Sequence, residues 1–134
     1  MSDHKAQSVG AGLSKVLFEI EESEWHDHAT ESMWAIPADN HVYRLDNIPF
    51  YAYGVSYCDV ISTKLVGGQN AFASVVASGG HSTYRLFLVG EESQQRFPDA
   101  WRRLHELGCD HERATDYFVA MDVPPESDIY KVRA

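Results

Sequence analysis

The segment from Arg44 to Thr63, RLDNIPFYAYGVSYCDVIST, constrains the fold more than any other part of the chain. It mixes turn-forming residues, among them Pro49 and Gly54, with aromatic and β-branched residues that favour burial in a sheet. This pattern predicts two strands joined by an irregular connection over residues 46–54. A second stretch of similar character, Ser74–Val89, is expected to pair with it in a compact, β-rich core.

Alternating hydrophobicity and turn signals predict further strands on both sides of this segment. The expected strands are Lys15–Glu21, Ser32–Pro37, His41–Leu45, Val55–Leu65, Ala71–Ala77, Thr83–Val89 and Asp116–Val123. Turns are expected at Ala38–Asn40, Gly67–Asn70 and Ser78–Gly80. Pro37 is expected to end its strand, because proline cannot donate to a sheet ladder.

After the expected strand Thr83–Val89, the spacing of apolar residues becomes helical. Phe97, Trp101, Leu104 and Leu107 recur at spacings of four, three and three, which predicts a helix over residues 94–107. Ser93 is expected to cap its start, with Pro98 in the first turn and Gly108 at its end. A second helix is expected over Glu126–Ala134.

This order of elements predicts an α+β fold. Mostly antiparallel strands form a curved or barrel-like sheet, and a strand-helix-strand-helix unit follows it. The two strands that flank the first helix could run parallel, with a right-handed crossover. Residues 1–14 are expected to be a flexible tail, and residues 15–134 a single α+β domain.

The charge balance limits the classes of partner. With 11 basic and 20 acidic residues the chain carries a net charge of −9, which argues against nucleic acid, because phosphate binding needs a basic surface. No apolar run approaches the roughly 20 residues that span a bilayer, so no membrane association is expected. Cys58 and Cys109 do not make a disulfide framework, and we expect free thiols and a cytoplasmic protein.

The acids are concentrated near the N-terminus, where no Lys or Arg lies between Lys15 and Arg44. One interpretation is a negative patch that steers a basic partner. The other is a solvated loop that keeps the protein soluble. On the first interpretation the partner-binding residues are Glu21, Glu22, Glu24, Trp25, Asp27 and Glu31.

The segment Gly79–Arg85, GGHSTYR, is the strongest candidate for ligand binding. Glycines let a ligand approach the backbone, consecutive amides and hydroxyls can hold an anion, and Arg85 can bind a phosphate or carboxylate. The candidate ligand-binding residues are Asn47, His81, Ser82, Thr83 and Arg85. His81 could also act as a base for Ser82. The other interpretation is a turn or bulge between strands, with Arg85 paired to Asp46 or Asp59.

Neither a phosphate-binding loop nor a hydrolase elbow is present in that segment, so we predict no catalytic residues. His26 and His28 have a spacing that metals use, and Cys109 and His111 could contribute, but a polar loop explains the histidines better and we predict no metal and no cofactor. The alternating Tyr51, Tyr53 and Tyr57 belong either to the core or to a surface that binds a partner.

Several strings resemble a known bacterial family in their order along the chain. They are SMWAIP, YRLDNIPFYAYGVSYCDVI, SGGHSTYRL, LGC and VAMDVPP. In this order they resemble the bacterial domain-of-unknown-function family 4265, and the resemblance extends over roughly residues 15–134. The family pattern usually has Gly where this chain has Cys58. The resemblance implies no established catalytic residues.

These observations lead to two functional hypotheses. The first is a non-catalytic, acidic protein-binding domain, for example an immunity-type or antitoxin-type inhibitor of a basic protein. The alternative is a small enzyme or ligand sensor that uses the Gly79–Arg85 segment for an anionic metabolite. A regulatory subunit that oligomerises through the aromatic strand face is a third hypothesis, and the sequence leaves the oligomeric state open.

Overall fold

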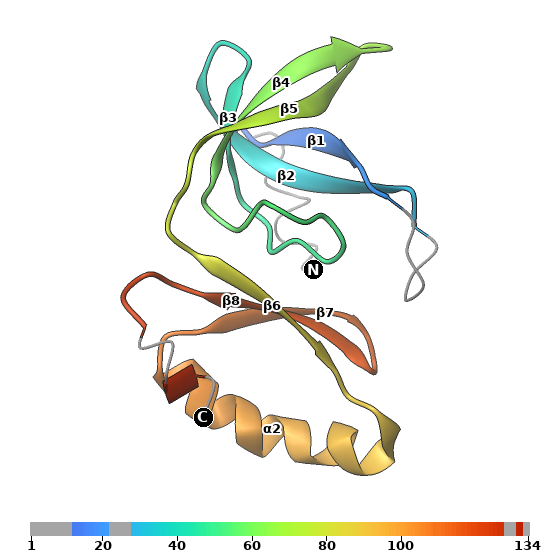
Figure 1. Ribbon diagram of the computed structural model, residues 1–134, viewed down its shortest axis with the longest axis vertical. Helices are drawn as coiled ribbons and strands as arrows, with labels where there is room; N and C mark the ends of the chain where they lie inside the picture. Colours follow the sequence, from blue (N-terminus) through green and yellow to red (C-terminus); the bar gives the residue numbers. More distant parts are fainter. Residues whose placement is uncertain (1–11, 22–27, 128–130, 133–134) are drawn as a thin grey trace.

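The computed structural model describes residues 12–21, 28–127 and 131–132 of the chain. It contains two sheets and one long helix (Figure 1). The elements in chain order are β1 (Ser14–Glu19), β2 (Thr30–Asp39), β3 (Val42–Leu45), β4 (Val60–Val66), β5 (Gln69–Ala77), β6 (Ser82–Phe87), α2 (Gly90–Glu106), β7 (Asp110–Thr115) and β8 (Phe118–Val123). Within the described part of the chain, no helix is both long and apolar enough to cross a membrane.

Strands β1 to β5 form a closed barrel in which each strand pairs antiparallel with the next. A parallel bridge between Leu17 of β1 and Ala71 of β5 closes it. The alternation in β1 directs Val16 and Phe18 into the barrel, where both are buried, and Phe72 of β5 stacks on Phe18 with ring centroids 4.8 Å apart. The predicted curved, barrel-like sheet is therefore confirmed.

The second sheet has the order β6-β8-β7, and both neighbouring pairs are antiparallel. Helix α2 packs on one face of it through an apolar stripe that includes Phe97 and Trp101. Every residue of the central strand β8 is buried. Its sequence is a nearly continuous apolar run, because both of its faces are covered. This sheet and its helix complete the predicted α+β architecture.

Between the barrel and the second sheet lies a long connection that we call the 46–59 loop. Figure 1 shows four successive layers, with the barrel at one end, then this loop, then the three-stranded sheet, and α2 at the other end. The loop contributes Ala52 and Val55 to the barrel core, and its aromatic residues Phe50 and Tyr51 contact Phe118 of the sheet. The loop therefore joins the two halves of the molecule.

Several expected strand boundaries need correction. The strand expected to start at Val55 begins at Val60, because residues 55–59 belong to the loop that packs against the second sheet. Pro37 does not end β2, which continues to Asp39 across a register shift where a missing N–H is tolerated. The turn that follows β2 is centred on Asn40 and His41 rather than on Ala38–Asn40.

The helix also starts earlier than expected. Helix α2 begins at Gly90 with Val89 as its cap, so Ser93 lies inside the helix and Pro98 lies beyond its first turn. Pro98 removes one backbone hydrogen bond at an exposed position, while Phe97 and Trp101 of the same helix pack against the sheet. Gly108 has φ +97°, which confirms the predicted left-handed end of the helix.

The unit after the helix differs most from the prediction. Strand β7 is not expected from the sequence, because its residues DHERAT are polar, and it forms an edge of the sheet. The strand expected over Asp116–Val123 begins at Phe118 and runs antiparallel, not parallel, to β6. Lys131 and Val132 are helical, while most of the expected second helix lies outside the described residues. Residues 1–11 of the expected tail also lie outside the described residues.

Candidate binding surface

The 46–59 loop is held in place by a carboxylate from the barrel. Glu31 of β2 accepts hydrogen bonds from three consecutive backbone amides, those of Phe50 at 2.7 Å, Tyr51 at 3.0 Å and Ala52 at 2.9 Å. Consecutive N–H groups that converge in this way form a concave anion site, and here the anion is the protein's own side chain. Glu31 thus orders the loop, and its predicted contact with a partner stays a prediction.

From the other side, Arg85 of β6 fixes the same stretch of loop. Its Nε donates to the Phe50 carbonyl oxygen at 2.6 Å, and a terminal nitrogen donates to the Ala52 carbonyl oxygen at 2.7 Å. The guanidinium also lies 4.9 Å from the ring centroid of Tyr53. Burial lowers the pKa of this guanidinium. Arg85 therefore bonds to two backbone carbonyls in place of the expected acid.

Asp59 has different partners from the one expected. Its carboxylate accepts hydrogen bonds from the amides of Ser56 and Gly79, both at 2.9 Å. A Cβ atom at position 79 would lie 2.7 Å from the carbonyl oxygen of Cys58, closer than real contacts allow. Gly79 thus permits a close backbone approach, as the sequence indicated, but to the protein's own loop.

His81 and Asp122 form a partly buried pair beside this contact. Nδ1 of His81 lies 2.9 Å from both carboxylate oxygens of Asp122, and the Tyr57 ring meets the imidazole edge-on with centroids 5.3 Å apart. Burial raises the pKa of Asp122, an effect that His81 opposes. Burial and the neighbouring Cys58 raise the pKa of Tyr57 to about 12. The pair connects the sheet to the loop.

The remaining candidate ligand residues are also placed by the structure. Thr83 shares a hydroxyl–hydroxyl hydrogen bond of 2.7 Å with Ser56, and Ser82 is half-buried in β6. Asn47 is buried, and its Oδ1 accepts a hydrogen bond of 2.6 Å from the Trp34 amide. Thr83 and Arg85 meet the 46–59 loop from the sheet, whereas Asn47 contacts the barrel.

Asn47 borders a hollow of about 190 Å³. The hollow lies where β1 and β2 of the barrel meet the first part of the loop and strand β7. Its lining residues are Lys15, Glu31, Ser32, Met33, Trp34, Asn47, Ile48, Phe50 and Glu112. His81, Thr83 and Arg85 are not among them, so the structure does not bring the predicted ligand residues together around one cavity.

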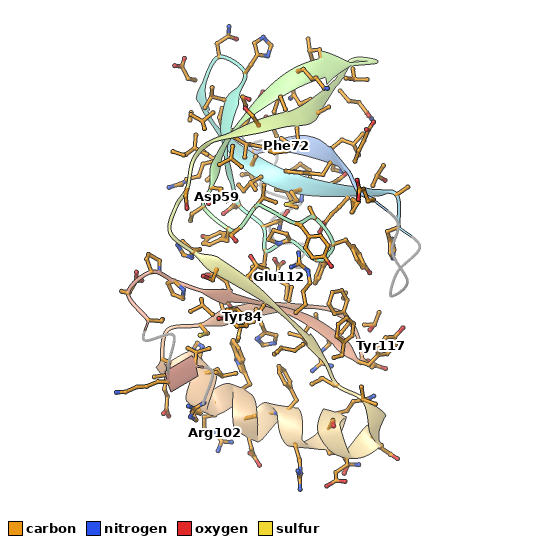
Figure 2. All side chains as sticks on the ribbon, viewed as in Figure 1. Asp59, Phe72, Tyr84, Arg102, Glu112 and Tyr117 are labelled. Carbon is orange, nitrogen blue, oxygen red and sulfur yellow. The ribbon has the colours of Figure 1, made fainter. Side chains whose placement is uncertain are left out.

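An aromatic surface borders the loop at one end of the second sheet. Phe118 is buried there, with Phe87 stacked on it at 5.0 Å and Tyr51 at 5.6 Å between ring centroids. Three aromatic residues of the loop and the second sheet are strongly exposed: Tyr53, which contacts Arg85, by 66%, Phe87 by 47% and Tyr117 by 56%. We call these three residues the aromatic surface. Tyr117 stands at the β7–β8 turn in Figure 2.

Residues 28–31, which follow most of the acidic residues of this region, meet the loop next to this surface. His28 stacks on Tyr51 with ring centroids 4.1 Å apart. Three positions later in the sequence, Glu31 accepts the hydrogen bonds of the loop amides. Glu21 is exposed at the end of β1. The other proposed partner-binding residues, Glu22, Glu24, Trp25 and Asp27, lie outside the described residues. The predicted patch is therefore described only at its two ends.

Sequence reasoning finds part of this arrangement. It selects Asn47, Thr83 and Arg85 as important polar residues, but it does not single out Phe87 or Phe118. The apolar run over residues 116–123 predicts Tyr117 in the core, which is wrong, because Tyr117 is exposed. Phe87 and Phe118 are cross-strand neighbours in the β6–β8 register, a relation that no local pattern reveals. Within the residues that the structure describes, no group of three metal-binding side chains occurs, and His26 lies outside them.

Comparison with known proteins places the chain in a family. A family model described as a domain of unknown function (DUF4265) matches residues 31–134, which is most of the chain. The chain belongs to the DUF4265 family. The match agrees with the order of motifs in the sequence. It assigns no activity to this DUF4265 protein.

The sequence resemblance leads us to expect glycine at the position of Cys58, and the backbone conformation there is one that suits glycine. The backbone of Cys58 has φ +72°, in the left-handed region that favours glycine. The thiol is free, and burial raises its pKa.

The fold also occurs in an experimental structure. A hypothetical protein from Neisseria gonorrhoeae superimposes with a TM-score of 0.75 at 12% sequence identity, over 90% of this chain and 81% of that one. A likeness at this identity shows the fold alone. No curated protein matches the DUF4265 chain.

Proposed function

We propose that this DUF4265 protein is a non-catalytic, acidic domain that binds a basic partner protein. The aromatic surface, next to which His28 stacks on Tyr51 of the loop, carries the proposal. Aromatic side chains are enriched at the centres of protein interfaces, and Tyr is one of the residues that most often dominates binding energy. Tyr53 stands exposed on the loop that Glu31 and Arg85 hold in place by hydrogen bonds, and Phe87 and Tyr117 stand exposed at the second sheet.

The alternative hypothesis, an enzyme or sensor for an anionic metabolite, has less support. Its central residues already serve the fold, because Arg85 bonds to two loop carbonyls and Thr83 bonds to Ser56. Releasing Arg85 for a ligand would leave the carbonyl oxygens of Phe50 and Ala52 without their donor, which is costly in a partly buried site. The net charge of −9 also opposes an anion and favours a basic partner.

An immunity-type or antitoxin-type inhibitor that blocks a basic active site is one concrete form of this function. The small size of the chain, its acidity and the exposed aromatic surface support that form. We also propose a cytoplasmic location, since Cys58 and Cys109 are free and thiols persist in a reducing compartment.

The proposal is tested by affinity capture from the native host at low and high salt. We expect one stoichiometric basic protein to be retained at low salt. Its binding should weaken at high salt, because salt screens the attraction between exposed charges. Tyr117→Ser should reduce retention by roughly fivefold or more, the effect of a residue worth about 1 kcal/mol in an interface.

Val76→Ser is the matched control for Tyr117→Ser. Val76 and Tyr117 are both 56% exposed, but Val76 lies on β5 of the barrel, whereas Tyr117 stands on the second sheet (Figure 2). Neutralising Glu21, Glu22, Glu24 and Asp27 tests the acidic contribution. A partner that is captured equally by the Tyr117 variant and by the neutralised variant would contradict the proposed surface.

A further inference from the structure

The hollow bordered by Asn47 has the size of a single side chain. Sites for small-molecule ligands usually enclose about 300–1,000 Å³. This hollow encloses about 190 Å³ between β1, β2, the loop and β7. Its dimensions therefore suit one side chain inserted from a partner protein better than a whole metabolite.

Two carboxylates stand in the wall of the hollow at fixed positions. Glu31 is held by three loop amides, and Glu112 accepts a hydrogen bond of 3.0 Å from the Ile48 amide. Figure 2 shows Glu112 on the side of the second sheet that faces the loop and the barrel. Because these bonds already order both side chains, the binding of a cation would not carry the entropic cost of ordering them.

The ring of Trp34 already attracts a cation of the protein itself. Nζ of Lys15 lies 5.1 Å from the centroid of the Trp34 ring, within the range of a cation–π contact. Lys15 is exposed and its stem is flexible, so an incoming cation can displace it. The Lys15 ammonium therefore occupies the position over the Trp34 ring that a cation from a partner would take.

We propose that this hollow receives an arginine side chain of the partner protein. The inference rests on the proposed function and names the chemistry by which the partner is recognised. A planar guanidinium can stack on the Trp34 ring while two of its N–H groups donate hydrogen bonds to the Glu112 carboxylate. A compact ammonium is less suited to both contacts. The carboxylates outnumber the basic residues among those that line the hollow, which favours a cationic occupant.

The test uses a probe that needs no partner, so its result is independent of the capture experiment. N-acetyl-arginine amide is titrated into the ¹⁵N-labelled protein, with the citrulline analogue as the uncharged control. We expect saturable shifts at the Trp34 indole and the Ile48 amide, with a Kd on the order of 1 mM, and no saturation with citrulline.

Two substitutions should move this affinity in opposite directions. Lys15→Gln removes the competing ammonium and should tighten binding by about threefold, whereas Glu112→Gln should weaken it by about threefold. The glutamine introduced by Glu112→Gln can still accept from the Ile48 amide, so the fold is retained, and Lys15 is exposed. Lys64→Gln, on β4 and outside the lining residues, should leave the affinity unchanged.

Three results would each overturn the inference: equal binding of the citrulline analogue, weaker binding by the Lys15→Gln protein, or unchanged binding by the Glu112→Gln protein. If the arginine probe fails while a basic partner is captured through Tyr117, only the inference falls. If the probe binds and no partner is captured, the proposed function fails and the hollow remains an arginine site.

Discussion

At the scale of single residues, Cys58 is the clearest case of local strain. A non-glycine residue in the left-handed region costs about 1–2 kcal/mol, and Cys58 has φ +72°. Cys58→Gly should therefore unfold at higher denaturant concentration than Cys58→Ala, by about 1 kcal/mol in free energy of unfolding. The Ala variant is the proper reference, since both variants remove the thiol. Equal stability of the two would show that the turn carries no strain.

His111 on β7 gives a second prediction at this scale. Its Nδ1 is buried and has no hydrogen-bond partner within the described part of the chain, and the Trp101 ring meets the imidazole at 4.1 Å between centroids. Burial, together with Arg113 and His105, lowers the pKa of His111, against the opposing effect of Asp110 and Glu112. The folded protein thus holds His111 neutral at a pH where the unfolded chain begins to bind a proton.

The sign of the pH dependence follows from this difference. Above about pH 6.5, the ordinary pKa of histidine, His111 is neutral in both states and does not reduce the free energy of unfolding. As the pH falls toward the lower folded-state pKa, the unfolded chain binds a proton that the folded protein does not, and the free energy of unfolding decreases. The loss amounts to at most about 1.4 kcal/mol per pH unit. Urea unfolding from about pH 7 to about pH 5 should show a smaller loss for His111→Phe than for the unsubstituted protein. Parallel curves would contradict the assignment.

At the scale of elements, strands with local signals are predictable from the sequence and strands defined by distant contacts are not. Strand β1 is predictable because Val16 and Phe18 alternate toward the core. Strand β7 is not, because its residues are those of an edge strand and only its pairing with β8 makes it a strand. Residues 55–59 have strand-like composition, but Val55 and Tyr57 serve to pack the loop.

The same limit applies to the candidate site. Polar residues such as Arg85 are recognisable as important, because a guanidinium is rarely buried unless it is paired. Its partners are not recognisable, since the carbonyl oxygens of Phe50 and Ala52 have no sequence signature. The aromatic surface is hidden for a related reason, because the contacts of Tyr53 with Arg85 and of Phe87 with Phe118 form only when the chain folds.

At the scale of the whole molecule, the 46–59 loop couples the barrel to the second sheet, and Arg85 is its central contact. Arg85→Gln should remove both bonds to the loop carbonyls and reduce the free energy of unfolding by about 2–3 kcal/mol, because partly buried acceptors lose their donor. Arg102→Gln, at an exposed position on α2 labelled in Figure 2, should change it by less than about 0.5 kcal/mol.

Amide hydrogen exchange can show whether the two halves then separate. Val16 in the barrel and Val119 in the second sheet are both fully buried and report on one half each. In the unsubstituted protein both amides should exchange with the same free energy, that of global unfolding. In Arg85→Gln the two values should diverge, because one half opens without the other. Values that fall together in the variant would mean that the remaining contacts between the loop and the sheet, such as those of Phe118 and the Ser56–Thr83 bond, suffice to couple the halves.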